Sequence, residues 1–370
     1  EASGSYASLA GYFYLGRGEF QSNNGGLTRS QVAGSNSVQE AFDSRFDIVN
    51  SLAVHPTTGQ LFAAISGSIV RFNGTAWVGE INNSSGGTNR LTDIVFTSSG
   101  RAFAAFSGNS DAAIQGVWTS ATGTGAWSRI ASNGNPAAWN SVGRCVLAIA
   151  PSAPNLLYAL YVDQAGGTEA DLWRWNQNTN TWTNFSGKLP DEPGGAAGND
   201  PFAVQGGYDL VVSVQPNNAN FVVIGGTNVY RIDNINTSAQ FERIGGYDNA
   251  NGYALWPNGG AGDTHHPDVH ALVFDPFNPQ TLYSGTDGGV HRTSNISTTN
   301  PAVTAWTNLN NDYQSYQYYY VYLDQQTGSN RVLGGAQDNG TTAGGTDFRF
   351  GNNTDHSSVF SGDGAACAIS

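Results

Sequence analysis

The sequence predicts an all-β fold, a β-propeller of four-stranded blades, from three observations. One unit of strand, turn, strand, glycine turn and strand recurs along the chain. Several copies close with a fourth short segment that carries a large aromatic side chain, and four strands per unit are typical of a propeller blade. No stretch shows sustained helical periodicity with caps, while the 48 glycines suit a chain with many tight turns.

The repeated unit is clearest between residues 266 and 293, which read HPDVHALVFDPFNPQTLYSGTDGGVHRT. An alternating apolar run over 269–274 ends at Asp275-Pro276, a second run covers 281–283, and a third covers 290–293 after an Asp-Gly-Gly turn. Alternation with period two, interrupted by Gly or Pro, is typical of short antiparallel strands. We therefore expect strands in this unit and in its copies.

Copies of the unit follow one another from residue 46, with a spacing of roughly 40 to 65 residues. The expected blades cover 46–80, 91–131, 142–187, 207–246, 265–310 and 314–350, with the start of a further blade at 356–370. The closing aromatics are Trp77, Trp127, Trp182, Phe241 and Trp306. This pattern predicts a seven-bladed propeller that forms one cooperative body.

The two ends of the chain depart from the repeat. Residues 1–45 are expected to form an N-terminal extension whose segment 11–15 supplies a strand, because a closed ring needs both termini in one blade. The final stretch, HSSVFSGDGAACAIS, has the pattern of a first strand without its successors. The last blade is therefore either incomplete in a truncated chain, which we favour, or closed by the N-terminal segment.

The charge balance disfavours some classes of partner. The chain carries 15 Lys and Arg against 28 Asp and Glu, a net charge of −13, which disfavours binding to a nucleic-acid backbone. No apolar run approaches the roughly 18 residues of a membrane-spanning helix, so we expect no membrane insertion. Because the sequence begins at Glu1 and contains no Met, we expect that a signal peptide or propeptide was removed, or that the chain is a fragment. We favour an extracellular or cell-surface protein.

Both cysteines, Cys145 and Cys367, fall in first-strand patterns. Small apolar positions suit a buried free thiol, which is the interpretation we favour. A disulfide between them stays open, since it would need a close approach across the ring.

Several segments resemble those of a known superfamily. LYSGTDGGVHRT, VLGGAQDNGTT and DVHALVFDPFNPQTLY are similar to repeats of the sortilin-like and xyloglucanase-like (BNR-type repeat) propellers, which include large secreted surface proteins of Bacteroidetes. The resemblance runs from about Asn50 to the end of the chain. The segments TNTWTNF and VTAWTNL are similar in position to the Asp box of sialidases, but they lack its Asp and Gly. This difference disfavours a sialidase.

An acidic residue stands at or just before the first strand of most units. These residues are Asp47, Asp93, Asp209, Asp268 and Asp363, with Arg144 near the equivalent place in the third unit. In a propeller, equivalent positions converge on one mouth of the central channel, where gathered carboxylates would repel one another and attract cations or sugar hydroxyls. The alternative is that each Asp caps a turn by accepting backbone N–H bonds.

Metal binding is a further hypothesis for the densest polar cluster. In an extended chain, His266, Asp268 and His270 would project from one face, as ligands of a transition metal do. A calcium site in the Asp-rich loops is a second possibility, and plain hydrogen bonding at the channel mouth is the third. Asp287 and Asp338 occupy matching Asp-Gly and Asp-Asn-Gly turns, for which a structural role is favoured.

Tyrosines crowd the stretch from 313 to 322. Tyr316 and Tyr318 could present flat faces and hydroxyls to a polysaccharide, although packing between blades explains them equally well. Two long loops rich in Gly, Pro and Asn, 188–207 and 245–264, are further candidate binding surfaces.

Two functions stay open. The first, which we favour, is a secreted non-catalytic propeller that binds protein or glycan at the cell surface. Such a propeller could assemble with copies of itself or form one segment of a larger complex. The second is a glycoside hydrolase that resembles the xyloglucanases and uses Asp47 and Asp268 as acid and base, roughly 6.5 to 9.5 Å apart if it inverts configuration. A shared fold does not carry a function with it.

Overall fold

The chain forms two compact units, residues 1–309 and 310–370, each described here by itself. A computed structural model describes residues 2–3, 12–13, 16–38, 43–82, 91–108, 114–130, 143–162, 170–192, 201–249, 251–257, 262–311, 318–345 and 357–369. Strands dominate both units, and the described helical segments are three short 3-10 turns, η1 (Ser186–Lys188), η2 (Gln205–Gly207) and η3 (Pro301–Val303). The all-β prediction is confirmed. No helix in these residues is long and apolar enough to cross a membrane.

The described residues of the first unit form five four-stranded sheets, each an antiparallel meander in chain order. Their strands are β5 (Val49–Val54), β6 (Leu61–Ile65), β7 (Ser68–Phe72) and β8 (Trp77–Asn82); β9 (Leu91–Phe96), β10 (Ala102–Ser107), β11 (Gly116–Ser120) and β12 (Ser128–Arg129); β13 (Cys145–Ile149), β14 (Leu156–Val162), β15 (Ala170–Asn176) and β16 (Thr181–Asn184); β17 (Val211–Val214), β18 (Val222–Gly225), β19 (Val229–Ile232) and β20 (Glu242–Gly245); β21 (Val269–Phe274), β22 (Leu282–Thr286), β23 (Gly289–Thr293) and β24 (Thr307–Asn308).

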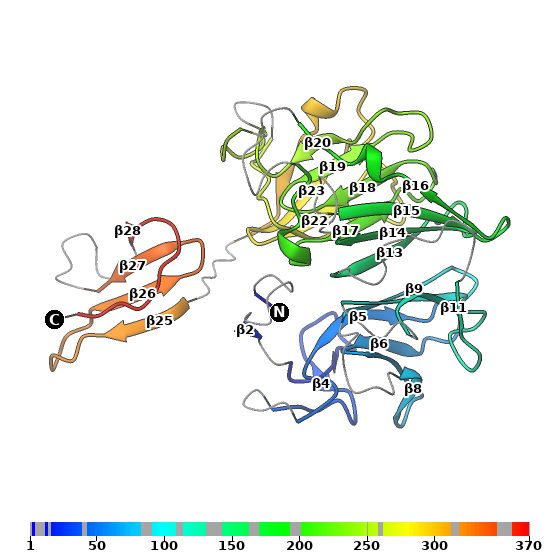
Figure 1. The fold of residues 1–370 in the computed structure, drawn as a ribbon. Coiled ribbons are helices and arrows are strands. Elements are labelled where there is room, and N and C mark those ends of the chain that lie inside the picture. Colours follow the sequence, from blue (N-terminus) through cyan, green and yellow to red (C-terminus); the bar gives the residue numbers. More distant parts are fainter. Residues whose placement is uncertain are drawn as a thin grey trace. The chain divides into compact units, whose positions relative to one another are not determined.

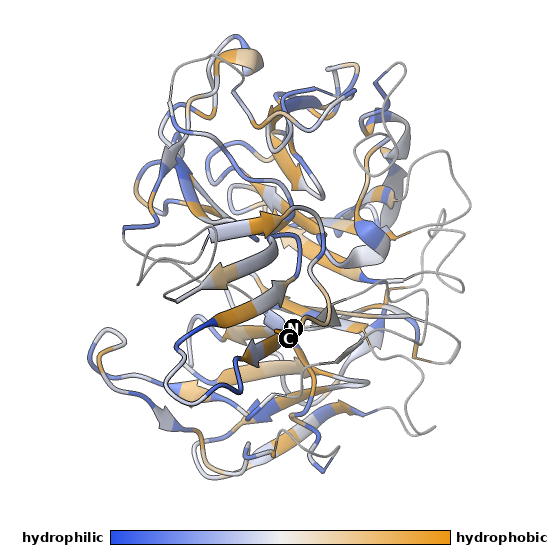
Figure 2. Ribbon diagram, turned by 90° about the vertical axis from the view of Figure 1, so that its left-hand side faces the viewer, coloured by the Kyte–Doolittle hydropathy of each residue, from blue (hydrophilic) through white to orange (hydrophobic). Residues whose placement is uncertain are grey.

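The five sheets are blades because their first strands lie side by side in chain order. β5 contacts β9, β9 contacts β13, β13 contacts β17, and β17 contacts β21, as Figure 1 shows from the blue to the yellow part of the chain. Figure 2 shows apolar residues gathered in these strands, with more hydrophilic residues in many of the connections. The predicted propeller architecture is therefore present in this unit.

Both faces of a blade are buried, which explains why its strands are almost wholly apolar. In β10, Phe103 and Ala105 pack with side chains of the third sheet, whereas Ala104 and Phe106 pack with β6 and β7 of the first sheet. Successive strand residues point to opposite faces, so a strand buried on both faces reads as a continuous apolar run instead of an alternating one.

In the described part of the N-terminal region, the short strands pair with one another. Tyr12–Phe13 (β2) pairs with Ala2–Ser3 (β1), and Phe20–Gln21 (β3) pairs with Ser30–Gln31 (β4), and none of these strands joins a four-stranded sheet. Val32 and Phe46 instead pack in the core of the first blade with Trp77. This part of the extension thus adds to the core of the first blade.

The second unit is a sixth four-stranded sheet of β25 (Tyr318–Leu323), β26 (Val332–Ala336), β27 (Gly340–Gly344) and β28 (Ser357–Phe360). We expected 356–370 to start a seventh blade, but β28 pairs with β27 and completes the sixth. Gly340, at the start of β27, allows β28 to approach this closely. Its φ is 70°, and a Cβ there would lie 1.9 Å from the Phe360 carbonyl oxygen. The described residues thus form six four-stranded sheets.

Both cysteines are free thiols. Cys145 is buried in β13, as expected, but Cys367 is partly exposed. A partly exposed thiol in the second unit differs from the buried position that its sequence pattern predicted.

Candidate functional site

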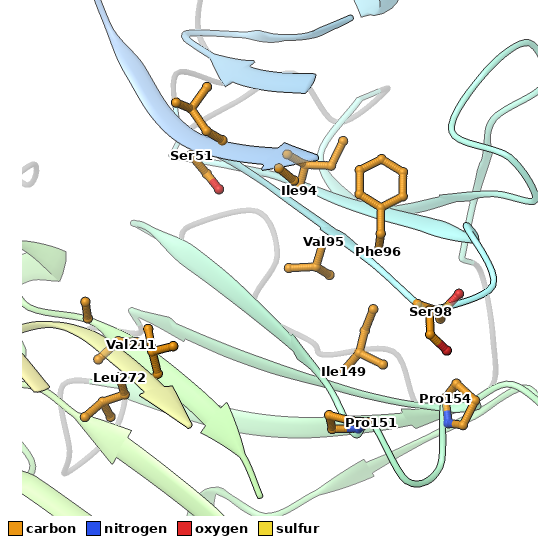
Figure 3. A pocket seen from close by; sticks show the side chains of 15 residues that line it. Ser51, Ile94, Val95, Phe96, Ser98, Ile149, Pro151, Pro154, Val211 and Leu272 are labelled. Atoms are coloured by element: carbon orange, nitrogen blue, oxygen red, sulfur yellow. The ribbon is translucent and has the colours of Figure 1, made fainter. Parts of the chain in front are cut away.

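The inner strands of the first unit line a cavity of about 710 Å³. Its lining consists of apolar side chains and three hydroxyls, as the close-up in Figure 3 shows. The lining residues are Ser51, Leu52, Ala53, Ile94, Val95, Phe96, Thr97, Ser98, Ile149, Pro151, Pro154, Val211, Ala271, Leu272 and Val273. All five first strands contribute, and none of the described lining residues has a titratable side chain.

A second site lies at the start of β17 and β21, where two of the predicted aspartates come together. Gln205 Nε2 donates to Asp268 Oδ1 at 2.6 Å and to Asp209 Oδ2 at 3.3 Å. Asp209 is fully buried, and its Oδ1 has no hydrogen-bond partner among the described residues. The two carboxyl groups therefore share one amide group.

The environment changes the acidity of Asp209. Burial, followed by the negative charge of Asp268, raises the pKa of Asp209 to about 9, while hydrogen bonds to its own backbone, Gln205 and Thr227 act in the other direction. The Thr227 hydroxyl lies beside this carboxyl group, although its geometry falls short of a well-formed hydrogen bond. The Asp209 carboxyl group is thus protonated at neutral pH.

Three more side chains extend this site toward solvent. Tyr208 Oη donates to Asp287 Oδ1 at 3.0 Å and Oδ2 at 3.1 Å. His270 Nε2 lies 2.6 Å from the same Oδ1, and the His270 ring meets that of Tyr208 edge to face at 4.7 Å. Asp287 therefore ties the two rings together, a more specific role than the turn that we expected.

Arg144 holds the segment that carries this site. Its Nη1 lies 3.2 Å from the Gly207 carbonyl and 3.3 Å from that of Tyr208. Gly207 has a φ of 97°, and a Cβ there would lie 2.9 Å from the Arg144 Cβ. Glycine at 207 thus lets the segment approach close enough for Arg144 to position Tyr208 and Asp209.

The carboxylates of two other predicted aspartates accept hydrogen bonds from neighbouring protein groups. Asp47 accepts hydrogen bonds from the Ser37 hydroxyl and, at 2.9 Å, from the Ser44 backbone N–H. Asp93 accepts the backbone N–H of Ile94 and of Leu147, each at 2.8 Å, and so joins β9 to β13. Burial raises the pKa of Asp93, while these bonds, and then the charge of Arg144, oppose the rise. Asp47 thus accepts an N–H from its own turn, as the turn-capping alternative has it, whereas Asp93 bonds N–H groups of two strands.

The remaining ligand candidates lie in or beside the second unit. Asp363 Oδ1 accepts the Asp338 N–H at 2.9 Å, and the Tyr318 hydroxyl bonds that of Thr342 at 2.9 Å. Tyr316 lies outside the described residues. Asp363 and Tyr318 thus make hydrogen bonds within their own sheet.

The metal site predicted from His266, Asp268 and His270 is not formed. Asp268 has a φ of 59°, so the backbone is not extended between the two histidines and the three side chains do not share one face. His266 Nδ1 bonds the Pro267 carbonyl at 2.9 Å, and His270 bonds Asp287. In the part of the chain that the structure describes, no three or more His, Cys, Asp or Glu residues are grouped to hold a metal ion.

Sequence reasoning missed Gln205, Tyr208 and Thr227 as members of this site. A signal existed for the first two, because Gln205 lies near the end of the long Gly- and Pro-rich loop 188–207 and Tyr208 directly precedes Asp209. Thr227 lies in the turn between β18 and β19, and nothing in its local sequence indicates that this turn folds back toward Asp209.

Comparison with known proteins adds to this description at the level of fold. No protein-family model matches the chain, and no curated protein matches it. A GH74 xyloglucanase from Xanthomonas campestris shares 16% identity at a TM-score of 0.53, over 85% of this chain and 45% of that one. The likeness is one of fold.

Two further solved structures agree. An ancestral GH74 enzyme shares 19% identity at a TM-score of 0.54, over 88% of this chain and 44% of that one. The GH74 enzyme of Niastella koreensis shares 16% identity at a TM-score of 0.50, over 85% of this chain and 47% of that one. The chain thus spans less than half the length of each, and identity this low carries the β-propeller architecture without the activity.

Proposed function

We propose that this chain is a non-catalytic propeller that binds a protein partner by taking an apolar segment into the cavity of the first unit. The observation that carries this proposal is the lining of that cavity, which is apolar apart from three hydroxyls. A volume of about 710 Å³ falls within the roughly 300 to 1,000 Å³ of ligand pockets, which are mostly apolar with a few polar groups.

The exposure of the inner strands supports the same function. Leu52 is 49% exposed and Val273 is 59% exposed, and both line the cavity. Contiguous exposed apolar surface marks interaction sites more often than isolated residues do. A protein segment suits this lining better than a glycan, because sugars pack on aromatic faces and Phe96 is the one aromatic among the described lining residues.

A glycoside hydrolase is the second candidate, because GH74 enzymes are among the proteins that share this fold. Asp47 and Asp268 would act as acid and base. Against it, Asp47 accepts two local hydrogen bonds, and neither residue lines the cavity. We also propose, from the sequence, that the protein works outside the cell or on its surface.

Selection from a random peptide library displayed on phage tests the binding function. We expect the selected peptides to be rich in apolar residues and to lose at least about tenfold in affinity for Leu52→Asp and Val273→Asp. Phe277→Asp is the matched control, because Phe277 is 95% exposed and lies outside the cavity. Equal binding by all three variants would sink the proposal.

Hydrolysis is tested by the release of reducing ends from xyloglucan and a panel of β-glucans, with Asp47→Asn and Asp268→Asn alongside. Release that either substitution abolishes would establish the hydrolase and overturn the non-catalytic function. We expect none from any polymer, with folding of each protein checked by circular dichroism.

A further inference from the structure

An oxygen-rich site lies between the fourth and fifth sheets, buried at Asp209 and Thr227 and open to solvent at Gln205. Asp209 precedes β17, Thr227 lies in the turn between β18 and β19, and Asp268 precedes β21. The Asp268 backbone N–H donates to the Thr227 carbonyl at 2.9 Å, and Gln205 Nε2 bonds both carboxyl groups. Three segments of two blades thus bring their side chains to one point.

Two of the oxygens at this point have no partner in the described part of the chain. Asp209 is 0% exposed and Thr227 is 3% exposed, and neither Asp209 Oδ1 nor Thr227 Oγ1 makes a hydrogen bond there. A buried polar atom without a partner costs roughly 1 to 3 kcal/mol, so such atoms in a folded protein need an explanation. By contrast, both oxygens of buried Asp93 accept backbone bonds.

We propose that Asp209, Asp268, the Thr227 hydroxyl and the Gln205 side-chain oxygen form a Ca²⁺ site that joins the fourth and fifth blades. Ca²⁺ takes six to eight oxygen ligands from carboxylates, amides, hydroxyls and water in flexible geometry. Rotation of the Gln205 amide by half a turn exchanges its nitrogen for its oxygen, which turns the group that bridges the carboxylates into a ligand.

The ligand chemistry selects the ion. All four groups are oxygen donors, which suit Ca²⁺, Mg²⁺ and Mn²⁺ better than Zn²⁺ or Cu²⁺. Mg²⁺ requires near-ideal octahedral geometry and keeps several waters, which suits a fully buried carboxyl group poorly. The two carboxylates of Asp209 and Asp268 would balance the charge of the dication. With Ca²⁺ between them, their mutual repulsion would no longer oppose ionisation of the Asp209 carboxyl group.

The site is separate from the proposed partner-binding cavity, because none of its four residues lines that cavity. Ca²⁺ would instead fix the segments before β17 and β21 against the turn between β18 and β19. Its role is to hold two neighbouring blades together, so it does not depend on the proposed function.

Calorimetric titration of the full chain with CaCl₂, after treatment with EDTA, tests the site. We expect a single Ca²⁺ per chain and a rise in Tm of roughly 5 °C when Ca²⁺ exceeds its Kd about a hundredfold. Asp209→Asn and Asp268→Asn should lose both effects, and Thr227→Val, which keeps the shape of the side chain, should weaken binding about tenfold.

The control is Asp275→Asn at the other end of β21, where Asp275 Oδ1 accepts the Phe277 and Asn278 N–H groups and Asn can do the same. It should bind Ca²⁺ as the wild type does. The proposal is overturned if the wild type neither binds Ca²⁺ nor gains Tm at millimolar concentrations. It is overturned equally if Asp209→Asn, Asp268→Asn and Thr227→Val bind as tightly as the wild type.

Discussion

Asp93 and Asp209 occupy comparable positions at the first strands of the second and fourth sheets, yet their surroundings differ. Both are buried, at 9% and 0% exposure. The two carboxyl oxygens of Asp93 accept hydrogen bonds from backbone N–H groups of β9 and β13. Asp209 instead faces a second carboxyl group, and one of its oxygens has no partner among the described residues. The same position in a repeat therefore stabilises one pair of blades and, at another, holds a buried carboxyl group that is not fully hydrogen-bonded within the described residues.

The largest expected effect is at Asp93. Asparagine offers one acceptor oxygen where two N–H groups need partners, so Asp93→Asn leaves a buried donor unpaired and should cost about 3 kcal/mol of stability. The midpoint of guanidinium unfolding, followed by Trp fluorescence, measures this. An unchanged midpoint would mean that the bond between β9 and β13 is not important for stability.

A pH titration tests another buried pair, His265 and His291, whose ring centroids lie 4.8 Å apart. Burial is the main cause that lowers the pKa of His291 from 6.5 to about 4 and that of His265 well below 6.5. Below pH 6.5 the unfolded chain therefore binds protons that the folded chain does not, and stability falls as the pH drops toward 4.

We expect this loss to reach about 2 kcal/mol between pH 6.5 and 4, with little dependence on these histidines above pH 6.5. Thermal unfolding in matched buffers checks it, and His291→Gln should flatten part of the slope. A Tm that stays level across this range would contradict the prediction.

A smaller effect is expected in the second unit, where Tyr318 is a partnered group like Asp93. Tyr318→Phe removes the hydroxyl bond to Thr342 and should lower stability by about 1 kcal/mol. Binding of polysaccharides by the variant, compared with wild type in affinity gels, shows whether Tyr318 also contacts a ligand. A loss of glycan binding at unchanged stability would support the ligand role expected for Tyr318.

The smallest effect, and one of opposite sign, is expected at Asp209 in the presence of EDTA. Asp209→Asn removes a carboxyl group that faces Asp268 and that, in the described part of the chain, accepts no backbone N–H of a neighbouring blade. Stability should therefore stay level or rise by about 1 kcal/mol. Guanidinium unfolding beside Asp93→Asn gives the direct comparison. A loss as large as that at Asp93 would show that the two positions are equivalent after all.

The strands were predictable because their pattern is local. The alternating run before Asp275 became β21, and the apolar run of the second sheet became β10. The segment Ser-Ser-Val-Phe was placed in the wrong sheet, because four residues do not distinguish a first strand from a fourth; that depends on the approach that Gly340 permits.

The candidate site was predictable only in part. Repeat alignment brought Asp209 and Asp268 to the same end of adjacent blades, which the hydrogen bonds to Gln205 support. The expected face of His266, Asp268 and His270 failed because it assumed an extended backbone, whereas Asp268 has a positive φ. Thr227 could not be found, because a contact between a turn and a strand of the next blade leaves no periodic trace in the sequence.

The meander order within every sheet has a consequence for biosynthesis. Each strand is hydrogen-bonded to the strand that precedes or follows it in the chain, so every blade is complete as soon as its own stretch has left the ribosome. Closing short loops costs little chain entropy, and domains with mainly local contacts fold quickly. Within the first unit, the nascent chain can therefore add its five blades one by one, each new blade covering the exposed apolar face of the one made before it.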